Sequence, residues 1–301
     1  MKSIGLAVIG ALVFLVISGE VGTSDGTENN LLSQIAQTVK KLQDIKVAPS
    51  DANIPPPAIP LLRELKQRLR DLIAVTLNAS TVAGEEPDAA KQMIIDALGR
   101  KGIRMEFPRE SKRGSYQRLS GYKSPYGNIY SIAIEKPVPN DDIIAATATI
   151  GINCGEDTSL WLFKKSGSLW VCIFINEVND YSDISAAQAN FTYRIVPSDK
   201  RDHINVVTAN ITPWCSSWWR KIRYIVQQVT VREEKSRTLL NESDDIYLGV
   251  DPKFYTLTAG TNYFVLKYYG GRIDGPLTAL PPQVTKAFEI KNGNIKRIEA
   301  K

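Results

Sequence analysis

Short segments rich in β-branched and aromatic residues fill the chain from Asn128 to its C-terminus, and this feature constrains the fold most. Turn residues separate the segments, a pattern that is typical of short strands. The segments are NIYSIAIE, IIAATATIGIN, SLWLFKK, LWVCIFIN, NFTYRIV, INVVTANI, KIRYIVQQVTV, FYTLTA, YFVLKYY, TKAFEIK and NIKRIEA. FKKSGSLW and EIKNGNIKR are typical of tight hairpins, the second through Asn292 and Gly293.

These segments predict an antiparallel sheet system of about ten strands, either a sandwich or a strongly curved sheet. No fixed repeat is visible in them, which argues against a propeller, although the similar hairpins suggest one.

The residues before this region show helical periodicity instead. Residues 20–30 are small and polar and predict a flexible tether. Apolar residues then recur at helical spacing within residues 31–42, 61–73 and 87–102, and we expect these faces to pack on their own domain. A Pro-rich spacer separates the first two helices, and a basic linker, residues 100–123, follows the third. The predicted fold is therefore α+β, with a helical and Pro-rich region over residues 20–123 and an antiparallel β domain over residues 124–301.

Residues 1–19 are typical of an export signal. One lysine precedes an uncharged apolar run from Ile4 to Gly19, which is shorter than the roughly 20 residues that a membrane span needs. Cleavage after Ser18 is the prediction, and an uncleaved N-terminal anchor is the alternative. We expect a secreted or periplasmic protein with no membrane contact beyond this segment.

Three cysteines would then lie in an oxidising compartment. Cys172 lies within the apolar segment LWVCIFI, where a cysteine can act as a small buried hydrophobe. Cys154 and Cys215 lie where strands meet turn residues. We predict a Cys154–Cys215 disulfide, with Cys172 kept as a thiol.

The stretch NITPWCSSWWRKIRYIV concentrates three of the five tryptophans with several cations. If it is a strand, Trp218 falls on the face that suits a core, and Trp219, Lys221 and Arg223 fall on the other. An exposed tryptophan can stack on a sugar ring, and cations beside it can hold anions. Trp219, Lys221 and Arg223 are therefore the predicted ligand-binding surface. The alternative is that Lys and Arg stems only cover a half-buried tryptophan.

The segment INEVNDYSD gathers Glu177, Asp180 and Asp183. Carboxylates of this kind serve glycoside hydrolysis and calcium binding, but the calcium-loop pattern is not met. A polar turn after a buried strand is the simpler interpretation. A carboxylate-based extracellular hydrolase centred on this loop remains the first alternative function.

A second alternative is a curved sheet that encloses a small apolar ligand, with Tyr193, Tyr224 and Tyr268 lining the pocket.

Neither charge nor motifs point to catalysis or nucleic acid. The net charge of +5 is too small to imply a nucleic-acid partner, and His203 is the sole histidine. The sequence contains no nucleophile elbow, zinc-protease, P-loop or dinucleotide motif. We expect a secreted, non-catalytic binding or structural module without a metal or cofactor, whose partner is a glycan or a protein.

Overall fold

The computed structural model describes residues 24–47, 53–79, 85–105, 124–138, 142–181, 183–200, 202–213, 217–232, 235–250, 253–271 and 280–299. The expected signal segment, most of the basic linker and Cys215 lie outside the described residues. Among the described residues, no helix is long and apolar enough to cross a membrane.

The three N-terminal helices that the apolar periodicity predicts are present. They are α1 (Ser24–Gln43), α2 (Ala58–Ala79) and α4 (Pro87–Arg100). Pro87 occupies the first turn of α4, where its missing N–H costs no helical bond. The tether prediction was wrong for residues 24–30, because α1 already begins at Ser24.

Twelve strands follow among the described residues, and they form three antiparallel sheets. Sheet 1 contains β1 (Ile129–Glu135), β2 (Ile143–Ile152), β3 (Gly155–Ser166) and β4 (Leu169–Asn176). Sheet 2 contains β5 (Ala189–Pro197), β6 (His203–Ile211), β7 (Trp219–Thr230) and β8 (Lys235–Tyr247). Sheet 3 contains β9 (Tyr255–Ala259), β10 (Tyr263–Tyr269), β11 (Gln283–Lys291) and β12 (Asn294–Ile298). The α+β prediction is thus confirmed in its coarse form, while the strands divide among three sheets.

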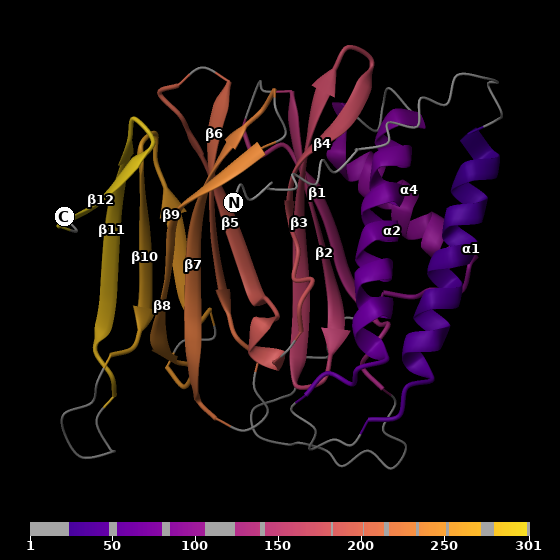
Figure 1. Cartoon of the computed structure of the whole chain (residues 1–301), viewed down its shortest axis with the longest axis horizontal. Helices are drawn as coiled ribbons and strands as arrows, with labels where there is room; N and C mark the ends of the chain where they lie inside the picture. Colours follow the sequence, from indigo (N-terminus) through magenta and orange to yellow (C-terminus); the bar gives the residue numbers. More distant parts are fainter. Residues whose placement is uncertain are drawn as a thin grey trace, which may run out of the picture.

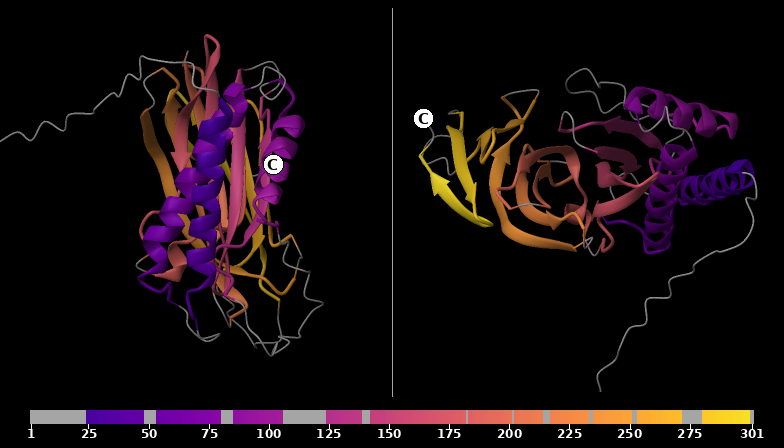
Figure 2. Two further views of the ribbon diagram at one scale, coloured as in Figure 1. Left: turned by 90° about the vertical axis from the view of Figure 1, so that its right-hand side faces the viewer. Right: turned by 90° about the horizontal axis from the view of Figure 1, so that it is seen from above.

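Each sheet is a meander in which every strand pairs with the next one along the chain. The helices lie beside sheet 1, and sheets 2 and 3 follow it in order (Figures 1 and 2). The molecule is therefore a stack of four layers.

Strand alternation explains how three cores fit between four layers. In β6, Val206 belongs to the core between sheets 1 and 2, and its neighbour Val207 belongs to the core between sheets 2 and 3. In β3, Trp161 faces the helices while Leu160 faces sheet 2. The strands at the middle of the stack are consequently buried on both faces, as an almost continuous apolar sequence predicts.

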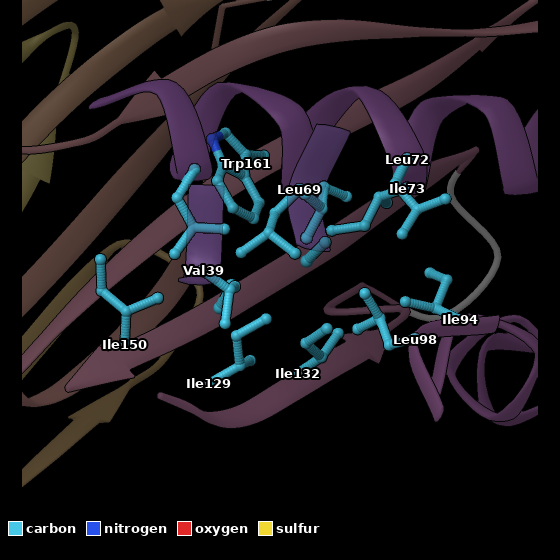
Figure 3. Packing of buried hydrophobic residues seen from close by; sticks show 14 of the residues in the cluster. Val39, Leu69, Leu72, Ile73, Ile94, Leu98, Ile129, Ile132, Ile150 and Trp161 are labelled. Carbon is cyan, nitrogen blue, oxygen red and sulfur yellow. The ribbon is translucent and has the colours of Figure 1, made fainter. Parts of the chain in front are cut away.

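The helical layer closes the outer face of sheet 1. Leu69, Leu72 and Ile73 of α2 are fully buried against it, and Ile94 and Leu98 of α4 join the same cluster (Figure 3). The prediction that the helical stripes pack on their own domain is confirmed. Met93 of α4 is exposed and does not belong to this cluster.

A candidate binding cleft between two sheets

The structure brings together two of the three residues that the sequence singled out. Trp219 and Lys221 of β7 line a cleft of about 720 Å³. Arg223 lies further along β7, opposite Ser243 of β8, and does not line it.

Of the two neighbouring tryptophans, Trp218 departs from the role that alternation predicted and Trp219 does not. Trp218 is 65% exposed, so its assignment to the core was wrong. It lies just before β7 begins, where the alternation of a strand does not yet hold. Trp219 is half-buried, and its ring lies 5.2 Å from that of Tyr247, its cross-strand neighbour on β8. Trp219 is therefore fixed in place beside Tyr247, in the lining of the cleft.

The opposite parts of the cleft come from segments that the sequence did not associate with Trp219. Strand β8 contributes Ser243, Asp244 and Asp245, sheet 3 contributes Tyr268, Val284 and Lys286, and Gly271 follows β10. The Nζ atom of Lys221 lies 2.7 Å from Oδ1 of Asp245, and both side chains are more than half exposed. This ion pair forms the rim of the cleft.

A hydrogen-bonded network forms the floor. Lys286 is only 9% exposed, and its Nζ atom lies 2.5 Å from Oδ2 of Asp244 and 2.6 Å from the hydroxyl oxygen of Tyr224. The Tyr224 hydroxyl also lies within hydrogen-bond distance of Glu242 and Asp244, at 2.5 and 2.9 Å. The floor is thus held by several mutually bonded charged and phenolic groups, which resists rearrangement.

The network keeps Asp244 ionised. Burial by itself raises the pKa of this carboxyl group. Hydrogen bonds from Lys286, Tyr224 and Tyr268 outweigh that effect and hold the pKa below its ordinary value. Burial and the neighbouring carboxylates raise the pKa of Tyr224 and of Tyr268, so both phenols stay protonated and can donate.

The acidic loop lies elsewhere, against the helical layer. Glu177 accepts hydrogen bonds from Trp161 Nε1, at 2.5 Å, and from Arg70, at 3.0 Å. Asp183 caps a short 3-10 helix, η1 (Ile184–Ala186), by accepting from the N–H of Ser185 at 2.9 Å. Asp180 is exposed on the same loop.

No three potential metal ligands converge among the described residues of the chain. Within the acidic loop, Glu177 is bonded to Arg70 of α2, and Asp183 caps η1.

A fully buried charge network underlies the acidic loop. Lys66 of α2 is 1% exposed and lies 3.0 Å from Oδ2 of Asp157 on β3. Its ammonium group also donates to the hydroxyl of Tyr181, at 2.6 Å, and to the carbonyl of Val178. The backbone N–H of Gln188 donates to the second oxygen of Asp157 at 2.9 Å. Both charges are thus compensated inside the protein, and this network links the helices to sheet 1.

A smaller cleft of about 320 Å³ opens between sheets 1 and 2. Its walls are mainly polar, with Thr147, Thr149 and Thr158 on one side and Arg194 on the other.

The three tyrosines of the enclosed-pocket alternative do not line one pocket, because Tyr224 and Tyr268 both donate to Asp244 while Tyr193 lies apart from them. Tyr193 lines the smaller cleft, Tyr268 lines the larger one, and Tyr224 lies fully buried in the floor of the larger cleft.

The predicted disulfide falls partly outside the described residues, because Cys215 is not among them, and it stays a prediction. A Cβ atom built on Gly155 would lie 2.9 Å from Cβ of Pro213, so the chains flanking the two cysteines run close together. Cys172 has a thiol that donates to the carbonyl of Phe174 at 3.5 Å. It is half-buried rather than fully buried, because β4 is an edge strand.

Sequence reasoning missed strand β8, and with it Asp244 and Asp245. The strand is polar and mostly exposed, so it lacks the apolar alternation by which strands are recognised. The signal that could have identified it is the length of otherwise unassigned chain between two clear strands.

Comparison with known proteins adds little. No protein-family model matches the sequence, and no curated protein matches it. Among solved structures, the β-propeller domain of Nup133 from Vanderwaltozyma polyspora has a TM-score of 0.23 and 11% identity, over 62% of this chain and 56% of that chain. The β-propeller domain of the Trilobed protease from Pyrococcus furiosus has a TM-score of 0.19 and 7% identity, over 56% and 57%. The chain spans a little over half the length of each, and the described strands form three open sheets.

Proposed function

We propose that the chain is an extracytoplasmic, non-catalytic binding module, and that the cleft between sheets 2 and 3 holds a saccharide. The observation that carries this proposal is the union of a fixed, half-buried Trp219 with donors and acceptors from β8 and β11 in one cleft. The stack of sheets serves as the rigid scaffold on which the cleft is built.

The chemistry of the cleft suits a sugar. A pyranose ring has an apolar C–H face, which can pack on the indole of Trp219. Its hydroxyl groups need both acceptors and donors, which the Asp245 carboxylate and the Lys221 ammonium group supply at the rim. A few such polar groups around an apolar contact are typical of ligand sites.

The contacts of Glu177 in the acidic loop argue against the hydrolase alternative. Glu177 already accepts from Trp161 and is paired with Arg70, and its side chain is 5% exposed. A general acid or nucleophile needs access to the substrate, which this environment does not give.

The test is a thermal-shift screen of the chain against soluble neutral and acidic oligosaccharides, followed by calorimetry on each sugar that raises the melting temperature. We expect Trp219→Ala to abolish the shift. Trp218→Ala is the matched control, because Trp218 is an exposed tryptophan next in sequence that does not line the cleft. Should no oligosaccharide bind, or should both variants lose binding equally, the saccharide proposal fails and a protein partner or a structural role takes its place.

A further inference from the structure

The sequence alone suggested that cations beside Trp219 hold an anion. In the described part of the chain, the two lysines that line the cleft are Lys221 and Lys286, and each lies against a carboxylate. Lys221 pairs with Asp245 at 2.7 Å, and Lys286 pairs with Asp244 at 2.5 Å. Neither lysine is therefore an uncompensated positive charge to which an acidic ligand would be drawn.

Among the described residues, the charged ones that line the cleft are two carboxylates and two ammonium groups, and each ammonium group is paired. Glu242 lies a further 3.8 Å from the Lys286 ammonium group. An acidic ligand would therefore have to compete with a carboxylate for each lysine of the lining, and like charges brought together exclude wrong partners.

The geometry points to a cleft that selects neutral saccharides and excludes uronates and other acidic ones. This inference rests on the proposed saccharide function and specifies its ligand class. The ion pair at the rim and the ion pair in the floor act as paired acceptors and donors for hydroxyl groups. Hydrogen bonds in which one partner is charged are stronger than neutral ones, so charge serves affinity here without requiring a charged ligand.

The sharpest probe is a pair of ligands that differ in one carboxylate. The neutral oligosaccharide that binds best in the screen is compared with the same oligosaccharide oxidised at C6 to the uronate, by calorimetry on the full chain. We expect the oxidised form to bind at least about tenfold more weakly. We also expect the affinity for the neutral form to be almost insensitive to salt between low and physiological ionic strength, because screening acts on charged ligands.

Asp245→Asn provides the converse test. It removes one negative charge and leaves Lys221 without its carboxylate, and this exposed pair contributes little to folding. We expect the variant to bind the oxidised ligand more tightly than the wild type does. The difference in affinity between the neutral and the oxidised ligand should therefore become smaller. Ser243→Ala, at the same cleft and without a charge change, should leave that difference in place.

The outcomes distinguish a failure of the selectivity inference from a failure of the proposed saccharide function. If the oxidised form binds as tightly as the neutral form or more tightly, and Trp219→Ala abolishes this binding, the saccharide function stands and the selectivity inference is overturned. If only acidic oligosaccharides bind, and their binding depends on Trp219, the inference is likewise overturned. If no oligosaccharide of either kind binds in a Trp219-dependent way, the proposed function itself fails.

Discussion

Individual buried charges fix the layers of this molecule to one another. Lys66 shows this most clearly, since its ammonium group has three acceptors inside the protein: Asp157, Tyr181 and the carbonyl of Val178. Lysine is almost never fully buried unless it is paired, so a lysine in an amphipathic helix is expected on its solvent face. The partner of Lys66 lies 91 positions away, so local periodicity could not reveal the pair.

Removing the charge of Lys66 should therefore be costly. Lys66→Met keeps most of the stem but leaves the buried Asp157 carboxylate without its cation, and we expect the free energy of unfolding to fall by about 3–5 kcal/mol. Denaturant titration at neutral pH measures this. Arg232→Ala is the control, because it breaks an exposed ion pair with Asp202 and should cost less than about 1 kcal/mol. Equal losses in the two variants would contradict the assignment of Lys66 as a buried anchor.

The floor of the larger cleft should make stability depend on pH through Asp244. Its pKa in the folded protein lies below the ordinary value of 3.8. The ionised form therefore stabilises the fold above that value, and this contribution is lost as the pH falls through the lower, folded pKa.

Asp244→Asn isolates this effect. We expect the variant to melt at a lower temperature than the wild type at pH 7, and the difference to shrink as the pH is lowered below about 4. Melting curves across that range measure it. A difference that stays constant down to pH 2 would show that the charge of Asp244 does not contribute.

Sequence patterns predicted the helices and strands that pack in a core, and they missed strand β8, which is mostly exposed. The helices were located because their stripes pack in one core, and eleven strands because they are apolar or alternating. Strand β8 was missed because it is an edge strand whose residues face solvent on much of its length. The larger cleft could thus be predicted only on its β7 side, at Trp219 and Lys221.

Strand β6 offers a test of the layered arrangement. Val206 and Val207 are adjacent and equally buried, and they point into different cores. A buried unpaired carboxylate costs several kcal/mol, which is a large part of the stability of a typical domain. We therefore expect Val206→Asp and Val207→Asp each to unfold or severely destabilise the protein, as measured by circular dichroism. If β6 had one solvent face, one of the two variants would melt like the wild type.

For the whole molecule, composition and periodicity predicted a mostly β protein with helices at its N-terminal end, and that is what the structure has. They did not predict the division into three sheets. Strand pairing depends on contacts between residues that are far apart in the sequence, and an apolar strand buried on two faces has the same sequence pattern in a sandwich as in a longer stack.

The order of the layers in space is also their order along the chain: helices, sheet 1, sheet 2, sheet 3 (Figure 1). Each layer can therefore complete its pairing as soon as its own residues are available, and then serve as the surface on which the next one assembles. Such sequence-local assembly favours rapid folding and a defined direction of growth. The larger cleft takes its Lys286 and Tyr268 from the layer that comes last along the chain. Ligand binding at that cleft would consequently report that the chain has finished folding.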